Sequence, residues 1–173
     1  MRTAGAEKTD SPDGAGRIGP FVRSKMFTNL FAHGMELVEE TATYLDDEGR
    51  RASRDLSREA ALAYAGVSMR LTTRLMQIAS WLLVLRAVRE GEMTPQEAGH
   101  EKYRIGPAER RPAGGDPAAG LPETLRNLIG QTDTLYARIT RLDRDLFVDV
   151  SAAPASGDAA GQLRALHDAF GTR

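Results

Sequence analysis

The chain contains no cysteine among its 173 residues. This absence excludes disulfides, thiolate metal sites and a cysteine nucleophile, and it fits a reducing cytosol. The formal net charge is only −1, from 23 basic and 24 acidic side chains, so no global field draws in nucleic acid or an anionic membrane surface. Residues 1–20 lack the apolar stretch of a secretory signal peptide. We therefore expect a cytoplasmic protein.

Long hydrophobic runs are also missing. The most apolar block, "LTTRLMQIASWLLVLRAV" at 71–88, holds the only tryptophan, and Arg74 and Arg86 enclose just eleven positions in it. A membrane-spanning helix needs roughly 20 consecutive apolar residues. The sequence therefore predicts no membrane span, and it leaves the block as either a buried core helix or a surface for another protein.

The spacing of apolar residues predicts an all-α fold. They recur at intervals of three and four over about 25–46, 57–90 and 122–147, the period of amphipathic helices. Gly49 is expected to end the first helix. Thr94, Pro95 and Glu97 match a capping box, which predicts a short helix over 95–102. We expect an antiparallel three-helix bundle with this short extra helix and flexible N- and C-terminal tails.

The flexible segments are predicted from composition. Residues 1–20 are rich in glycine and proline, and seven of the fifteen residues in 106–120 are of these two types. We expect a disordered extension over 1–20, a bundle domain over 21–147 with a flexible loop at 106–120, and a largely disordered tail over 148–173. Within that tail a short helix over 159–170 would place three apolar side chains on one side, a candidate partner motif: Leu163, Leu166 and Phe170.

The helix over 57–90 carries two overlapping apolar stripes. The first comprises Tyr64, Leu71, Leu75, Ile78, Leu82 and Leu85, and the second, with members seven residues apart, comprises Leu62, Met69, Met76 and Leu83. A helix that is apolar on two faces packs against two neighbours. We expect both stripes to be buried and this helix to be the centre of the fold.

No motif in the sequence supports catalysis. The "GAGRIG" at 14–19 matches a dinucleotide-binding fingerprint but lacks the required strand and helix around it. Glu97 and His100 form one Glu-x-x-His unit, whereas a di-iron bundle needs a second. Glu36, Glu39 and Glu40 are expected to face water. We predict a protein that is not an enzyme, with no catalytic residue, metal, cofactor or small-molecule substrate.

A row on the central helix changes from polar to apolar along its length. It comprises Arg70, Arg74, Gln77, Trp81, Val84 and Val88. One interpretation is that its apolar half packs under the short helix after Thr94. The other makes the row a candidate subunit or partner interface, because tryptophan and arginine are the residues that most often dominate binding.

A basic cluster lies between the first two helices and raises DNA binding as an alternative function. It comprises Arg50, Arg51, Arg54 and Arg58, interleaved with acidic residues. Counterion release is weak without a clean basic patch. A small helical DNA-binding or regulatory domain therefore stays the alternative to an interaction protein.

The stretch "SMRLTTRLMQIASWLLVLRAVREGEMT" at 68–94 closely resembles the signature of the RcdA family, the alphaproteobacterial regulators of CtrA degradation. The following "EKYRIG" and the flanking "YLDDEGR" and "LSREAALAYA" are similar to that family as well. The resemblance covers roughly 26–106, and the last helix matches only in character.

This resemblance implies a three-helix bundle that forms a homodimer, carries a disordered C-terminal tail and has no catalytic activity. It further implies an adaptor for the ClpXP protease. Such an adaptor works with the response-regulator co-adaptor CpdR and passes on cargo such as the cell-cycle regulator CtrA through a further adaptor, PopA.

Overall fold

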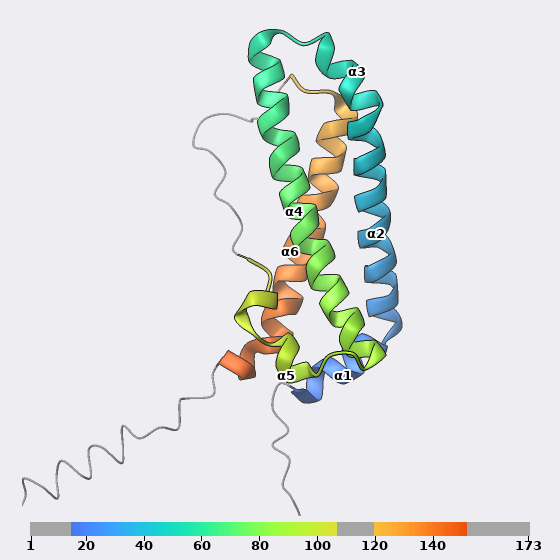
Figure 1. Cartoon of the computed structure of the whole chain (residues 1–173), viewed down its shortest axis with the longest axis vertical. Coiled ribbons are helices and arrows are strands. Elements are labelled where there is room, and N and C mark those ends of the chain that lie inside the picture. The colour runs from blue at the N-terminus through green and yellow to red at the C-terminus, as the bar shows by residue number, and fades with distance from the viewer. Residues whose placement is uncertain (1–14, 107–119, 152–173) are drawn as a thin grey trace, which may run out of the picture.

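The computed structural model describes residues 15–106 and 120–151, and within these ranges the chain is helical without strands (Figure 1). This confirms the all-α prediction. The elements are α1 (Ala15–Arg23), α2 (Lys25–Asp46), α3 (Glu48–Arg54), α4 (Arg58–Glu90), α5 (Pro95–Ala98), the 3-10 turn η1 (Glu101–Tyr103) and α6 (Glu123–Ser151).

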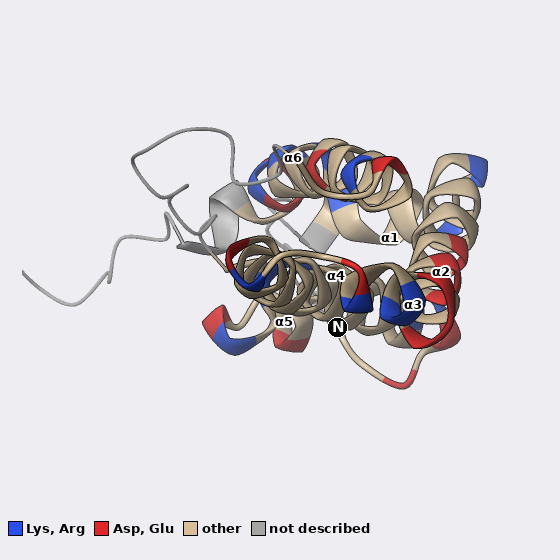
Figure 2. Ribbon diagram, turned by 90° about the horizontal axis from the view of Figure 1, so that it is seen from above, with Lys and Arg blue, Asp and Glu red and all other residues tan. Residues whose placement is uncertain are grey.

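The three long helices α2, α4 and α6 lie side by side, and α1 and α5 close one end of the bundle (Figures 1 and 2). Helix α6 runs in the same direction as α4, since Arg74 pairs with Asp133 and, further along both helices, Trp81 bonds Asp143. The expectation of an antiparallel bundle is thus wrong for this pair. The chain re-enters the structure at Gly120, at the end of the bundle opposite α5, and a long crossover of this kind lets two helices run parallel.

Helix α1 replaces part of the disordered extension that composition predicts over residues 1–20. Its side chains Ile18, Phe21 and Val22 are buried, at 0%, 8% and 1% exposure, and Phe21 packs edge-on against Phe27 with ring centroids 5.7 Å apart. Glycine and proline are frequent here, but these three apolar residues have the three- and four-residue spacing of a helix face. Their burial against the bundle offsets the ordering entropy.

Capping residues mark the helix ends, and the capping box at Thr94 is the one predicted above. The side chains of Ser24, Ser57 and Thr94 each accept a hydrogen bond from a backbone N–H of the following first turn. The capping box of Thr94 and Glu97 is complete, and the hydrogen bond from the backbone N–H of Thr94 lowers the pKa of Glu97. Gly91 ends α4 with a φ of 78°, the left-handed geometry that glycine adopts most readily.

Gly49 does not end the first helix as expected. Asp47 takes that place, and Gly49 lies buried in the first turn of α3. A Cβ atom added to Gly49 would lie 2.4 Å from the Tyr64 hydroxyl and 2.9 Å from the backbone oxygen of Tyr44. The glycine is therefore required because two tyrosines approach the backbone closely.

Replacing Gly49 with alanine should lower the free energy of unfolding by about 1–3 kcal/mol, because overpacking outweighs the gain in helix propensity. Gly130, which meets nothing within 4 Å, supplies the control. There the same change should raise stability by roughly 0.5–1 kcal/mol. Urea unfolding of both variants measures the difference, and a stabilised Gly49→Ala protein would contradict the close approach.

Candidate interaction surface

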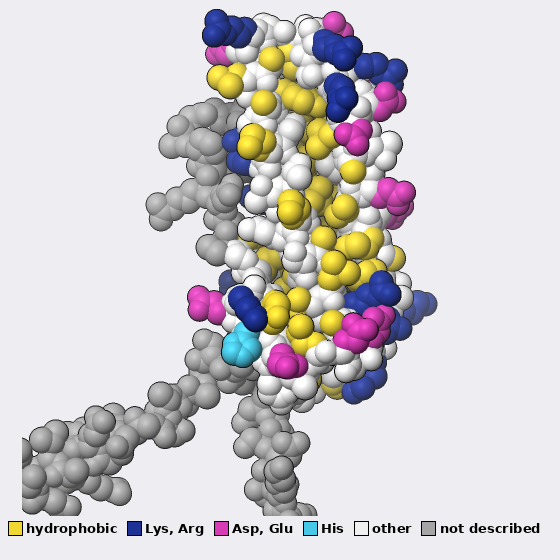
Figure 3. All heavy atoms as spheres, viewed as in Figure 1, with side chains coloured by type: hydrophobic (Ala, Val, Ile, Leu, Met, Phe, Trp, Pro, Cys, Tyr) yellow, Lys and Arg dark blue, Asp and Glu magenta, His cyan; other side chains and the backbone are white. Residues whose placement is uncertain are grey.

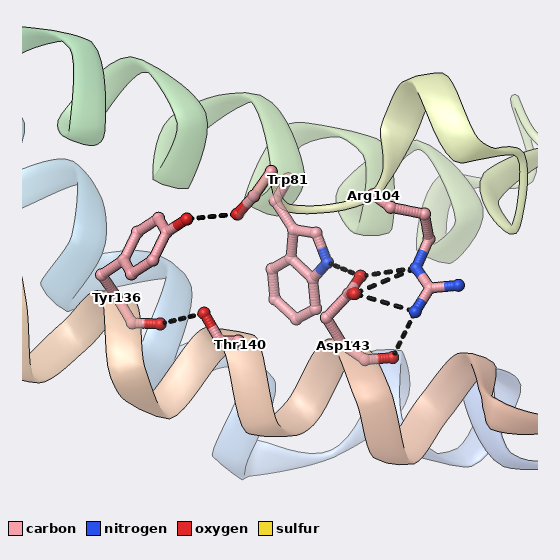
Figure 4. A network of polar contacts seen from close by, with 6 residues as sticks. Trp81, Arg104, Tyr136, Thr140 and Asp143 are labelled. Atoms are coloured by element: carbon pink, nitrogen blue, oxygen red, sulfur yellow. Dashed lines mark hydrogen bonds and ion pairs between the residues drawn. The ribbon is translucent and has the colours of Figure 1, made fainter. Parts of the chain in front are cut away.

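Trp81 lies inside the bundle and is held by a polar network (Figure 4). Its side chain is 2% exposed, and its indole Nε1 donates to the Asp143 carboxylate at 2.8 Å. Arg104 approaches the same carboxylate with Nε and Nη2, at distances of 2.8 to 3.0 Å, and its guanidinium stacks 4.5 Å above the ring of Phe147. The network joins α4, α6 and the segment after η1.

The candidate interface row around Trp81 is therefore mostly internal. Arg74 forms an ion pair with Asp133 and lies 5.1 Å over the ring of Tyr136, while Arg70 and Gln77 are half-buried. Val84 and Val88 pack partly buried against the core. Trp81 is not accessible to a partner, and this geometry agrees with the interpretation in which the apolar half of the row packs inside the fold.

Asp143 and Arg104 are the residues that sequence reasoning missed. Asp143 follows Ile139 by four positions and precedes Leu146 by three. It thus occupies a core position of the α6 pattern, and its residue is 5% exposed. A charged residue at such a position signals a buried partner, although the sequence does not say which arginine supplies it.

Four large apolar side chains of α4 are exposed instead of buried. These members of the second stripe, hereafter the α4 strip, are Leu62, Met69, Met76 and Leu83, with exposures of 77%, 72%, 65% and 50%. The side chains of the first stripe are buried as predicted, but no described residue covers the second. Figure 3 shows hydrophobic side chains following the length of α4 on its open side. We interpret this exposed apolar row as a candidate interaction surface.

Helix α4 is also long and apolar enough to cross a membrane when only length and composition are considered. An 18-residue window within it has a mean hydropathy of 1.2, and 33% of that window is buried. A core helix of a soluble protein meets the same criteria. Because eight α4 side chains are buried in the bundle, we assign α4 to the core.

An open acidic groove runs along α2 and α3. It is lined by Glu36, Glu39, Glu40, Thr43, Tyr44, Asp47, Glu48, Arg51 and Thr124, and Figure 2 shows acidic residues gathered on these helices. Two of the four clustered arginines pair with neighbouring acids: Arg50 lies 4.0 Å from Asp46 and Arg51 2.8 Å from Asp47. The basic cluster is partly neutralised, which weakens the case for DNA binding.

Tyr44 lines this groove, Tyr64 meets Tyr44 near Gly49, and both tyrosines have raised pKa values. Burial is the main cause for both, and for Tyr44 the nearby Tyr64 and Glu48 add to it. For Tyr64 the contact with the Ser68 side chain lowers the pKa, and burial outweighs it. The Tyr44 hydroxyl is buried without a hydrogen-bond partner among the described residues.

The two phenols should make the fold sensitive to alkali. Because their folded pKa values lie above the usual 10.0, their contribution to stability is fully present below pH 10.0 and is lost as the pH rises through the folded values. The free energy of unfolding, measured by urea titration across this range, should fall. A Tyr44→Phe, Tyr64→Phe double variant should lose most of that slope, and an unchanged slope would contradict the assignment.

The described residues contain no group of three or more His, Asp or Glu side chains arranged to hold a metal ion. Within the part of the chain that the structure describes, the Glu97 and His100 unit belongs to no such group. Leu163, Leu166 and Phe170, the candidate tail motif, lie outside the described residues, and the loop predicted over 106–120 lies mostly outside them.

Comparison with known proteins supplies the family. The chain matches the family described as "Protein of unknown function (DUF1465)" over residues 18–170. Its structure is similar to the crystal structure of RcdA from Caulobacter crescentus CB15, with 52% sequence identity and a TM-score of 0.62. That match covers 74% of this chain and 96% of RcdA. No curated protein matches the chain. The protein therefore belongs to the DUF1465 family, the family of RcdA.

Proposed function

We propose that the protein is a non-enzymatic, cytoplasmic adaptor that helps deliver regulatory proteins to the ClpXP protease. The observation that carries this proposal is the 52% identity to RcdA over 96% of that chain, which supports an RcdA-like role. The cargo would be CtrA-like cell-cycle regulators. A CpdR-like response regulator and a PopA-like adaptor would be the partners, and the adaptor would act as a homodimer.

The physical features suit an interaction protein. Methionine is enriched at protein interfaces and adapts its shape to different partners, and two methionines occupy the centre of the α4 strip. The acidic groove on α2 and α3 offers a second surface of different chemistry, suited to a basic partner. An adaptor needs such surfaces, and it needs no reactive site.

Affinity capture from the native cytosol tests the proposal. The full chain is compared with a chain ending at Ser151, because α6 continues to Ser151 and a cut at Phe147 would remove its last turn. We expect both chains to enrich ClpX or its response-regulator co-adaptor, and the full chain alone to enrich cargo.

A reconstituted assay supplies the second readout. Purified ClpXP with its co-adaptors should degrade a CtrA-like cargo faster when the full chain is added, and the chain ending at Ser151 should give less acceleration. Capture of DNA or a metabolic complex, with no acceleration of degradation, would overturn the adaptor function.

A further inference from the structure

The acidic groove along α2 and α3 concentrates negative charge on a chain whose formal net charge is only −1. Five carboxylates and one guanidinium line it, those of Glu36, Glu39, Glu40, Asp47, Glu48 and Arg51. Arg51 pairs with Asp47 at 2.8 Å, and Glu48 accepts a long hydrogen bond from the Thr124 hydroxyl at 3.5 Å. The cation of the groove is thus already paired with one of its acids.

Three glutamates of α2 carry charge that no described residue compensates. Glu36 is three residues from Glu39 and four from Glu40, so the three side chains stand on one side of the helix. All three are exposed, and among the residues that the structure describes none forms an ion pair with them. Like charges at these spacings destabilise a helix. A cation bound across them would remove that repulsion.

The base of the groove contains a polar atom without a partner. Tyr44, one turn after Glu40, lines the groove and is 5% exposed. Its hydroxyl is buried without a hydrogen-bond partner among the described residues, and it lies close enough to Glu48 for that carboxylate to raise its pKa. A hydroxyl oxygen can accept a hydrogen bond, and a buried one left unsatisfied costs free energy. The groove therefore suits a ligand that brings both positive charge and N–H donors.

We propose that this groove binds a basic segment of a partner protein, with basic side chains on Glu36 and Glu40 and one guanidinium reaching the Tyr44 hydroxyl. The inference deepens the proposed adaptor function and rests on it for the class of the partner. Arginine suits the inner position, because its planar guanidinium can donate to a carboxylate and to a neighbouring oxygen at once. The carboxylates would repel a nucleic acid, and no group of described residues is arranged to hold a metal ion.

The spacing of the glutamates sets the spacing of the cations that they bind. Glu36 and Glu40 are four residues apart, which is about 6 Å along the helix axis. A partner helix presents the same separation between basic side chains four residues apart. We therefore expect the bound segment to be a helix with basic residues at this interval.

Fluorescence anisotropy with a designed peptide tests the site on the full chain. The probe is a labelled helical peptide of alanine and glutamine with arginine at every fourth position. In the control peptide citrulline replaces the arginines, which keeps N–H donors and removes the charge. We expect the arginine peptide to bind with an affinity that falls with added salt. The citrulline peptide should bind about tenfold more weakly, and equal binding of the two would contradict a charge-based site.

Paired charge variants locate the binding. A Glu36→Gln, Glu40→Gln double change should weaken binding of the arginine peptide about tenfold, as expected for the loss of two exposed ion pairs. The matched control is Glu92→Gln, Glu101→Gln, which removes the same charge from exposed positions on either side of α5, at the end of the bundle away from α3 (Figure 1). Equal affinities of the two double variants would overturn the site.

Tyr44→Phe tests the contact with the hydroxyl. The change keeps the ring and removes an unsatisfied polar atom, so the free protein should not lose stability in urea unfolding. Its affinity for the arginine peptide should nevertheless fall about tenfold, because the guanidinium loses an acceptor. An unchanged affinity would overturn the role of the hydroxyl in the site.

Two further outcomes separate this site from its alternatives. Displacement of the peptide by Mg²⁺ or Ca²⁺ at constant ionic strength would show a metal site and overturn the proposal. In the degradation assay, the Glu36→Gln, Glu40→Gln protein should accelerate cargo degradation less than the Glu92→Gln, Glu101→Gln protein does. Equal acceleration would overturn the use of the groove by a partner, while the adaptor function stands. If the natural chain gives no acceleration, the adaptor function fails and the peptide titration still judges the groove.

Discussion

Replacing Trp81 with alanine is expected to lower the free energy of unfolding by about 3–5 kcal/mol. Trp81 is among the largest fully buried side chains of the described core, so its removal leaves a cavity between α4 and α6. The change also takes away one of the donors to Asp143. Urea unfolding followed by circular dichroism measures the loss without relying on tryptophan fluorescence.

Two further variants separate packing from hydrogen bonding at this position. Trp81→Phe keeps an aromatic ring and loses the indole N–H, so it should cost less than the alanine change. Trp81→Glu places a charge in the core and should prevent stable folding. A Trp81→Ala protein of native stability that fails only in partner capture would restore the interpretation of Trp81 as a surface contact.

Replacing Asp143 with alanine is expected to cost about 3 kcal/mol, at the lower end of what breaking a buried ion pair costs. The lower end applies because the Arg104 side chain is 21% exposed, whereas that of Asp143 is 7% exposed. The substitution leaves the Arg104 guanidinium and the Trp81 N–H without their acceptor. It should loosen the segment after η1 from α6, which hydrogen exchange of residues 99–106 would detect.

Asp143→Asn and Arg144→Ala serve as controls for this prediction. Asparagine keeps an acceptor for Trp81 and removes the charge, so a smaller loss of about 1–2 kcal/mol is expected. Arg144, the next residue in α6, is exposed, and its removal should change stability by less than about 0.5 kcal/mol. Equal losses at 143 and 144 would show that the network contributes little.

The sequence by itself determined where most of the helices lie, because helix periodicity and capping depend on residues close together in the chain. The three- and four-residue spacing of apolar side chains located α2, α4 and α6 to within a few residues, since helix periodicity is a short-range property. Thr94 and Glu97 marked the start of α5, because capping depends on a single turn. The resemblance of the segment over 68–94 to the RcdA family was likewise visible in the sequence and is confirmed by the structural match.

The tertiary structure alone decided how these elements are used. Composition could not show that Ile18, Phe21 and Val22 find a hydrophobic surface, so α1 was missed. The direction of α6 depends on where the chain re-enters the bundle at Gly120, and periodicity carries no information about it.

The same limit applied to α4, whose two stripes are both apolar. Only the placement of α2 and α6 determined that Leu71 and Leu82 face the core while Met69 and Met76 face outward. The spacing of apolar residues predicts that a helix face will be buried. Which neighbouring elements cover that face, in the same chain or in another, is determined only by the tertiary structure.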